Sequence, residues 1–357
     1  MSEANGREAV TGAGDPTATT GPVPAWGGRG QGLIIEEAVR RLPEPLRGLL
    51  ATETHLARLR EAAATPDDRT EPGSDAEPPA EHPSRFFRID AVTDEPYPFK
   101  NFPRRQPEAE AAFGAEALKA AGTAPWVAAQ ALDRLADALA DGRTDAVFAA
   151  AGDLARTAAG LHMPLHTTKN RDGQRTGNHG ISRVLEVGLI HRYADSCEKE
   201  IRKDPRGVRY LRDPTDRLFD WLIAAHGRIG PILEADAVAR KQAKYNPAQH
   251  PEDLDDLDAA RARPYYETLK RELARRGSPE AAALRDAAAH LADLLYTAWV
   301  RAGKPLALWP AADAGRKPAP SPPYWLLVLA VGMLILLLWP RRRPDTTGRE
   351  DSGPGSP

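Results

Sequence analysis

Cysteine is almost absent from this chain, with a single residue, Cys197, among 357. One thiol excludes an internal disulfide framework and a zinc site built from cysteines. Aromatic residues make up only 6% of the chain, with 8 tyrosines, whereas alanine, leucine, arginine and glutamate are abundant. Because good helix formers dominate, the composition favours a helical core and argues against an all-β sandwich.

The chain also lacks an excess of either charge. Lys and Arg number 48 against 50 Asp and Glu, which gives a formal net charge of -2. A dedicated nucleic-acid-binding protein usually shows a basic excess, so the charge balance gives no strong nucleic-acid signal. The 33 prolines are excluded from helix interiors and are expected in linkers and at helix starts.

The hydropathy pattern predicts one helical domain preceded by a disordered segment. Residues 1–25 hold almost no large apolar side chain and no apolar run of the kind that a secretory signal needs. Residues 26–303 are predicted to form a single all-α domain, a helical bundle without a significant sheet. Apolar residues recur at helical spacing after Leu33 and again over 108–121, 125–140, 145–161, 182–202, 214–243, 265–275 and 279–302.

The end of the chain differs in kind. A Pro-rich linker is predicted over 304–322, a transmembrane helix over 323–340 and a disordered basic tail over 341–357. The apolar run carries no charge, is flanked by Tyr324, Trp325 and Trp339, and is near the lower limit of about 17 residues for a bilayer-spanning helix. The alternative, a buried core helix, is disfavoured because the prolines between 318 and 323 separate the run from the domain.

The predicted partner of this run is the lipid bilayer, in a single-pass arrangement. Basic residues are nearly balanced around it, with Lys304, Arg316 and Lys317 before it and four arginines after it. The positive-inside rule therefore gives little orientation. Because no signal-like segment precedes the helical domain, the sequence favours a cytoplasmic domain held by a C-terminal anchor; the alternative is a start that omits an upstream signal.

Two stretches carry a family resemblance. The first is Ala-Trp-Gly-Gly-Arg-Gly-Gln at 25–31, followed by Leu-Pro-Glu-Pro-Leu at 42–46; the second runs from Leu161 through Pro-Leu-His and Asn-Arg-Asp-Gly-Gln to Glu186. Supporting matches occur at 65–67, 88–90, 97–99, 125–127 and 298–303. Together they resemble the superfamily of zinc-dependent bacterial phospholipases C and fungal single-strand-specific zinc nucleases, over nearly the whole helical domain.

This resemblance implies phosphodiester hydrolysis by a three-zinc cluster in an all-helical cleft. Zinc ions in such a cluster polarise the phosphoryl group and lower the pKa of a bridging water. The ligands that the family uses are imidazoles, carboxylates, and the amino and carbonyl groups of an N-terminal tryptophan, all of which are ordinary zinc ligands.

This chain departs from the family at most of these positions. By the resemblance, ligand positions are substituted by Gln31, Arg85, Arg156, Gly160 and Ser182, and Gly160 replaces the carboxylate that bridges two metals. The family's tryptophan position is kept by Trp26, and a family ligand or base position by Asp67, or by its neighbour Asp68. The third metal site keeps His166 and Glu186.

Two interpretations of the remaining metal site stay open. A catalytic zinc needs at least three protein ligands, so His166 and Glu186 could hold at most one ion, and only by recruiting His162 or His179. Otherwise His166 hydrogen-bonds Glu186 in an empty cleft. No cofactor is expected beyond that one zinc.

The arginine substitutions are the second open question. A guanidinium stays protonated and cannot ligate zinc. Arg85 and Arg156 are therefore predicted to lie near each other and to pair with Asp67, Asp68 or Glu186, replacing the charge of the lost metals. The functional alternative is a metal-free anion site, since arginine binds phosphate through two parallel hydrogen bonds.

The sequence thus predicts a membrane-anchored, catalytically degenerate homologue of zinc-dependent phosphodiester hydrolases that binds a phosphorylated ligand or a protein partner through the old cleft. The first alternative is an active phosphodiesterase with a reduced metal set. The second is a membrane-tethered scaffold whose helical domain docks another protein.

Overall fold

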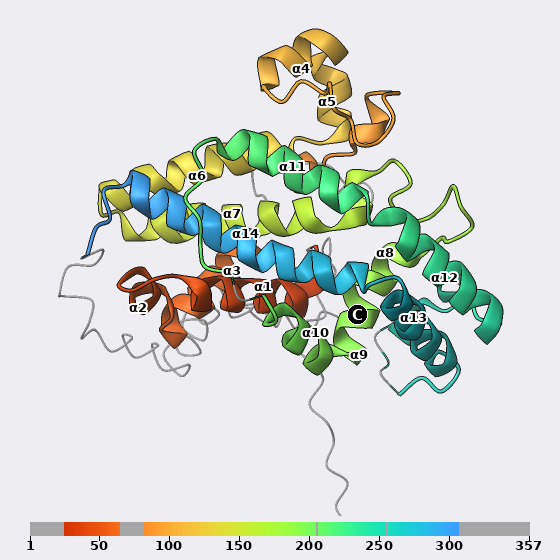
Figure 1. The fold of residues 1–357 in the computed structure, drawn as a ribbon. Helices are drawn as coiled ribbons and strands as arrows, with labels where there is room; N and C mark the ends of the chain where they lie inside the picture. The colour runs from red at the N-terminus through yellow and green to blue at the C-terminus, as the bar shows by residue number, and fades with distance from the viewer. Residues whose placement is uncertain (1–24, 65–81, 205, 255, 257, 307–357) are drawn as a thin grey trace, which may run out of the picture. The chain divides into compact units, whose positions relative to one another are not determined.

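The computed structural model describes residues 25–64, 82–204, 206–254, 256 and 258–306, and within these ranges the chain is helical without a strand (Figure 1). The all-α prediction is confirmed for this part of the chain. The α-helices are α1 (Gly27–Arg41), α2 (Leu46–Leu50), α3 (Glu53–Ala64), α4 (Gln106–Phe113), α5 (Ala115–Ala121), α6 (Ala124–Ala140), α7 (Thr144–His162), α8 (Ile181–Arg183), α9 (Ile190–Arg192), α10 (Ala194–Ile201), α11 (Pro214–His226), α12 (Ile229–Ala243), α13 (Arg263–Arg275) and α14 (Pro279–Arg301).

Short helical turns of other types connect them. The 3₁₀ turns are η1 (Pro83–Arg85), η2 (Ile89–Ala91), η3 (Pro164–Thr167), η5 (Pro247–Gln249) and η6 (Pro251–Leu254), and η4 (Val184–Leu189) is a π-helical turn. Proline stands at the first position of η1, η3, η5, α11 and α14. There its missing N–H removes no helical hydrogen bond, as the sequence analysis expected.

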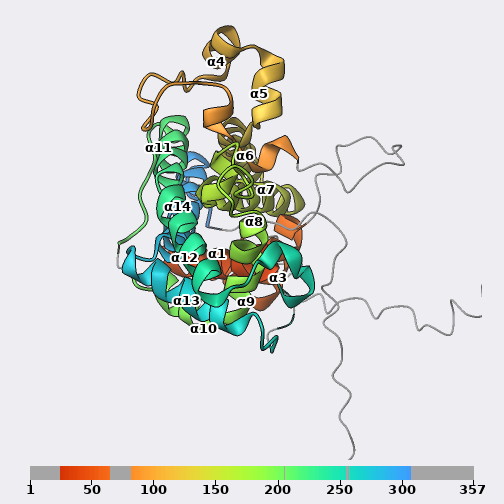
Figure 2. The ribbon, with the colours of Figure 1, turned by 90° about the vertical axis from the view of Figure 1, so that its right-hand side faces the viewer.

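Helices α7 and α14 form the centre of the bundle. Helix α7 packs against α3, α6, α11 and α14, and α14 packs against α1, α6 and α10 (Figures 1 and 2). Alanine is the most frequent buried residue of both helices, and small side chains let helix axes approach closely. Helix α7 also lies close to α3 at Gly152, where an added Cβ would lie 2.5 Å from the Cβ of Ala62. A larger side chain there would push α3 away from α7.

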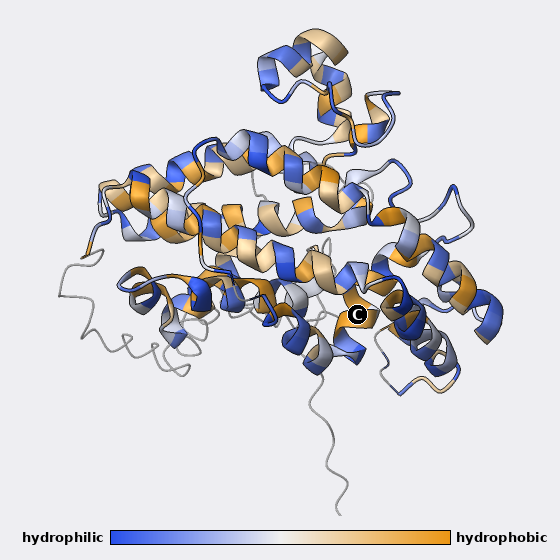
Figure 3. Cartoon of the chain, in the orientation of Figure 1, coloured by the Kyte–Doolittle hydropathy of each residue, from blue (hydrophilic) through white to orange (hydrophobic). Residues whose placement is uncertain are grey.

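A second apolar cluster lies where α12 and α13 pack on η4. Its buried members include Leu165, Ile181, Leu185, Tyr265 and Leu269. Each long helix of the bundle carries both hydrophobic and hydrophilic residues (Figure 3), as helices with one buried face do. This cluster positions η4 and therefore Glu186.

Three predicted helices are divided in the structure. The segment 108–121 is interrupted at Gly114, whose φ of 86° no helix allows, and 214–243 is interrupted between His226 and Ile229. The segment 182–202 is not one regular helix: it contains η4 and a break at Tyr193. These boundaries escaped prediction because the apolar spacing continues across them.

None of the helices in the described ranges is both long and apolar enough to cross a bilayer. The predicted span 323–340, the tail 341–357, most of the linker 304–322 and most of the segment 1–25 lie outside the described residues.

Candidate functional site

Trp26 is fully buried at the start of α1. Its backbone is in the left-handed region, with φ 70°, and its indole Nε1 donates a hydrogen bond to the carbonyl of Ala159 at 3.2 Å. The next residue, Gly27, packs so closely on η4 that an added Cβ would lie 2.7 Å from the carbonyl oxygen of Glu186. Trp26 is therefore placed between α7 and the segment that carries Glu186.

His166 and Glu186, the two residues of the remnant metal site, are in direct contact. The Nε2 atom of His166 lies 3.0 Å from Oε1 of Glu186, and Nδ1 lies 3.3 Å from the carbonyl oxygen of Arg85. Both ring nitrogens thus face oxygen acceptors, and neither is directed at an open coordination site. A general base needs one free ring nitrogen toward its substrate, so this pair is not arranged for proton abstraction.

The two histidines that could complete a zinc site have other partners. The Nδ1–H of His162 donates to the carbonyl of Ala158 at 2.7 Å, and its Nε2 accepts from Nδ1 of His290 at 2.7 Å. His179 pairs with Asp172, 2.9 Å away. The described residues contain no group of three His, Cys, Asp or Glu side chains placed to hold a metal ion.

Gly160 lies against the backbone of Arg85. A Cβ added to Gly160 would lie 2.2 Å from the carbonyl oxygen of Arg85 and 3.2 Å from its carbonyl carbon. The same carbonyl oxygen faces His166. The backbone of η1 therefore occupies the space in which a side chain at position 160 would begin.

Arg85 and Arg156 are both buried, with 6% and 4% of their surface exposed. Arg156 pairs with Asp153, one helical turn earlier in α7, at 2.5 Å, and Asp153 also accepts from Arg134 at 3.0 Å. Asp153 was not among the predicted site residues, although it stands three residues before Arg156 on a predicted helix, which is the spacing of an intrahelical ion pair.

The remaining positions that the resemblance selects are Gln31, Ser182, Asp67 and Asp68. The amide of Gln31 donates to the carbonyl of Ala63 at 3.4 Å. The hydroxyl of Ser182 donates to the carbonyl of Arg171, and its backbone N–H to Asp172 at 3.2 Å. Asp67 and Asp68 are outside the described residues, so their predicted pairing with the arginines stays a prediction.

We call Trp26, Arg85, Gly160, His166 and Glu186 the remnant cleft. They come from five separate segments of the chain: contacts join Gly160 to Arg85, Arg85 to His166 and His166 to Glu186, and Trp26 bonds to Ala159, the neighbour of Gly160. The described contacts of His166 are hydrogen bonds within the cluster, to Arg85 and Glu186, and Arg156 pairs separately with the half-buried Asp153. Such a cluster can bind and orient groups, but it presents no vacant metal ligand set among the described residues.

The loop that carries the most specific motif, 167–180, is held by its own polar side chains. Asp90 accepts from the hydroxyl of Thr168 and from the backbone N–H of Lys169, both at 2.7 Å. Asp172 accepts from the N–H of Gly180 at 2.9 Å, and the amide of Asn178 donates to Asp236 at 2.6 Å. These hydrogen bonds hold the loop in place. The motif therefore has a structural role, because the loop positions His166 before it and Glu186 after it.

The His162–His290 pair is buried and neutral. Burial lowers the pKa of His162, and burial together with His162, Arg206 and Arg228 lowers that of His290 further. The indole of Trp221 stacks on His290 with 4.0 Å between ring centroids. The pair is therefore a core contact between α7 and α14.

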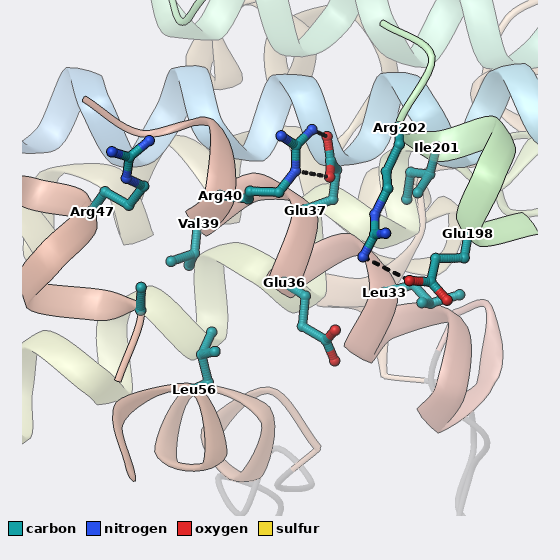
Figure 4. A pocket seen from close by; sticks show the side chains of 11 residues that line it. Leu33, Glu36, Glu37, Val39, Arg40, Arg47, Leu56, Glu198, Ile201 and Arg202 are labelled. Atoms are coloured by element: carbon teal, nitrogen blue, oxygen red, sulfur yellow. Dashed lines mark hydrogen bonds and ion pairs between the residues drawn. The ribbon is translucent and has the colours of Figure 1, made fainter. Parts of the chain in front are cut away.

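A pocket of about 260 Å³ lies between α1, α2, α3 and α10 (Figure 4). Its charged side chains are paired: Arg40 with Glu37 at 2.7 Å and Arg202 with Glu198 at 2.6 Å, as Figure 4 shows, and Glu36 with Arg60 at 2.5 Å. The remaining lining is apolar, including Leu33, Val39 and Leu56. Because its charged side chains form ion pairs, this pocket has no excess charge that would attract a charged ligand.

Glu280 is a buried acid near Cys197, and its Oε2 makes no hydrogen bond within the described residues. Burial, and then the charge of Glu200, raise the pKa of Glu280 from 4.5 to about 7. Burial likewise raises the pKa of Cys197 to about 11, so this thiol is not a nucleophile at neutral pH.

Replacing Glu280 with glutamine is expected to stabilise the protein in a pH-dependent way. A carboxyl whose folded-state pKa is raised contributes stability below its unfolded value of 4.5, and that contribution is lost as the pH rises through about 7. E280Q should raise the free energy of unfolding by about 1–3 kcal/mol at pH 8 and by little at pH 4. Denaturant titrations at the two pH values test this, with the exposed Glu267→Gln as control; an equal effect of both variants would contradict it.

No protein-family model, curated protein or solved structure matches this chain.

Proposed function

We propose that this protein is a membrane-tethered, catalytically degenerate relative of the zinc-dependent phospholipases C and single-strand nucleases, which acts by binding at the remnant cleft and not by hydrolysis. The proposal rests first on the closeness in space of residues that the family resemblance selects. Trp26, Arg85, Gly160, His166 and Glu186 were selected from the sequence by resemblance alone; contacts join the last four, and Trp26 bonds to Ala159, next to Gly160. A fold of the phospholipase C type would bring these positions together.

The close contact of Gly160 with Arg85 is the observation that carries the loss of catalysis. The carboxylate at this position bridges two metals in the family, and here the carbonyl oxygen of Arg85 is 2.2 Å from where even its Cβ would stand. His166 uses both ring nitrogens in contacts with oxygen atoms. Arg156 is buried and pairs with Asp153, and a guanidinium at this position cannot ligate zinc.

Metal content and hydrolysis test this directly. Full-length protein purified without chelator and dialysed against a small excess of zinc should retain less than one zinc ion per chain by elemental analysis. Its hydrolysis of bis(p-nitrophenyl) phosphate should equal that of a sample treated with EDTA. Two or more zinc ions per chain, or hydrolysis that EDTA abolishes, would establish the active phosphodiesterase instead.

The membrane tether is the second part of the proposal and rests on the uncharged apolar run 323–340. A span of this length places the helical domain next to one membrane face, where a phosphorylated lipid or a membrane protein is accessible. Extraction of membranes with carbonate at high pH should leave the full-length chain in the pellet. A deletion that begins at residue 323 should release the domain to the supernatant; release of the full-length chain would contradict the tether.

A further inference from the structure

A second pocket, of about 490 Å³, lies where α1, α9, α10 and α13 meet (Figures 1 and 2). Basic side chains from all four helices line it: Arg29 from α1, Arg192 from α9, Lys199 from α10 and Lys270 from α13, with His191 of α9 beside them. Asp195 is the acidic residue in the lining. We call this the basic pocket.

The charges of the basic pocket are largely available to a ligand. Among the described residues, Arg29, Lys199 and Lys270 have no carboxylate within the 4.0 Å of an ion pair. Lys270 is held over the ring of Tyr193, 4.0 Å from its centroid, which positions the ammonium group without neutralising it. The pocket therefore holds three cations that form no ion pair within the described residues, although Glu280 lies near enough to Lys270 to interact with its charge.

Arg192 contributes differently, because its guanidinium is partly used within the fold. It donates to the carbonyls of Asp253 at 2.7 Å and of Asp256, and it stacks on the ring of Tyr266 at 4.3 Å. Carbonyl acceptors fix a guanidinium without cancelling its charge as a carboxylate does. Arg192 thus contributes a guanidinium that is held in place at the edge of the pocket.

The N-terminal end of α10 adds to the positive electrostatic potential of the basic pocket. This helix begins at Ala194, and its N-cap residue Tyr193 offers no side-chain hydrogen bond to the first turn. Ala194, Asp195 and Ser196 of that turn line the pocket. The N-terminal end of a helix carries a partial positive charge that favours anions. The carboxylate of Asp195 offsets only part of the combined charge of three unpaired cations.

We propose that the basic pocket binds a multiply charged phosphate group, either as a free phosphate ester or as the headgroup of an anionic lipid. The whole chain is close to neutral, with 48 basic against 50 acidic residues, so this concentration of cations is local and not a consequence of a basic protein. Three or more cations converging on one pocket exceed what a single carboxylate requires, and they match the charge and oxygen count of phosphate. The site is separate from the remnant cleft and does not depend on the proposed function.

Calorimetric titration of the full-length protein in a neutral detergent tests the proposal. The two probes are inorganic pyrophosphate, for a free phosphate, and dihexanoyl phosphatidic acid, for a lipid headgroup. At least one should bind saturably, with an affinity that falls as salt is raised. Tenfold tighter binding of the short-chain lipid would identify a headgroup site, and equal or tighter binding of pyrophosphate a free-phosphate site.

Matched variants locate the binding. The double substitution K199Q/K270Q should weaken the tighter probe by at least about tenfold, which corresponds to the loss of two charges at the ligand. The control K119Q changes an exposed lysine on α5 that does not line the pocket and should bind as the wild type does. Thermal unfolding confirms that the variants are folded. The proposal is overturned if neither probe saturates below about 10 mM, or if K119Q weakens binding as much as the double variant.

Discussion

Replacing Gly160 with aspartate is expected to lower the free energy of unfolding by at least about 3 kcal/mol, enough to unfold many domains of this kind. The new Cβ would lie 2.2 Å from a backbone carbonyl oxygen, and the carbonyl belongs to a turn that is itself bonded to the domain. Backbone cannot rotate away as a flexible side chain can, so α7 and η1 would have to separate. Replacing Gly160 with alanine should already lower the free energy of unfolding by a large part of this amount.

The matched control is Gly230→Ala in α12. An added Cβ at Gly230 meets no atom within 4 Å, and alanine in a helix is favoured over glycine by about 1 kcal/mol. G230A should therefore be neutral or stabilising, while G160A and G160D are strongly destabilising in the same urea titration. A fully stable G160D would mean that the space for the family's bridging carboxylate is still open, and would remove the main support for a degenerate site.

Removing the carboxylate of Asp236 is expected to destabilise the protein by about 3–5 kcal/mol. Asp236 has no exposed surface and accepts hydrogen bonds from Arg240 at 2.6 Å, from the amide of Asn178 at 2.6 Å and from the hydroxyl of Tyr265. In D236A the guanidinium of Arg240 would stay largely buried without its counter-charge. The loop 167–180 and helices α12 and α13 would lose their common contact.

Two comparisons separate this effect from ordinary surface electrostatics. The Glu36–Arg60 pair is 43–44% exposed, so Glu36→Ala should cost less than about 1 kcal/mol. The double variant D236L/R240M removes both charges together and should recover a substantial part of the stability lost in D236A. If D236A unfolds at the same urea concentration as the wild type, the ion pair does not hold the loop.

The helical nature of the domain was predictable because apolar spacing and helix-forming residues report directly on local structure. The breaks were not predictable by the same means. At Gly227 an added Cβ would lie 2.5 Å from the hydroxyl of Tyr97, and at Gly188 it would lie 2.1 Å from the hydroxyl of Tyr266. Both contacts join residues far apart in the sequence, so the local pattern around either glycine carries no trace of them.

Some contacts of the candidate site were open to prediction from the sequence, and others were not. Resemblance identified residues 85, 156, 166 and 186 as neighbours, and it left open the contact between His166 and Glu186 that the structure contains. It did not identify Asp153 as the partner of Arg156 or His290 as the partner of His162. A motif of metal-binding residues carries no information about the hydrogen-bond partners of its residues elsewhere in the chain.

The π-helical turn η4 connects Glu186 to helix α9, and its number of residues sets the angle between them. Glu186 lies within the turn, and His191 and Arg192 follow it in α9. A π turn accommodates one residue more than an α-helical turn, and each residue of an α-helix advances the chain by about 100° around the axis. Deleting a single residue from 187–189 would keep Glu186 near its place and rotate the side chains of α9 by about 100° away from the basic pocket. The angle between Glu186 and the side chains of α9 is thus set by the number of residues in this turn.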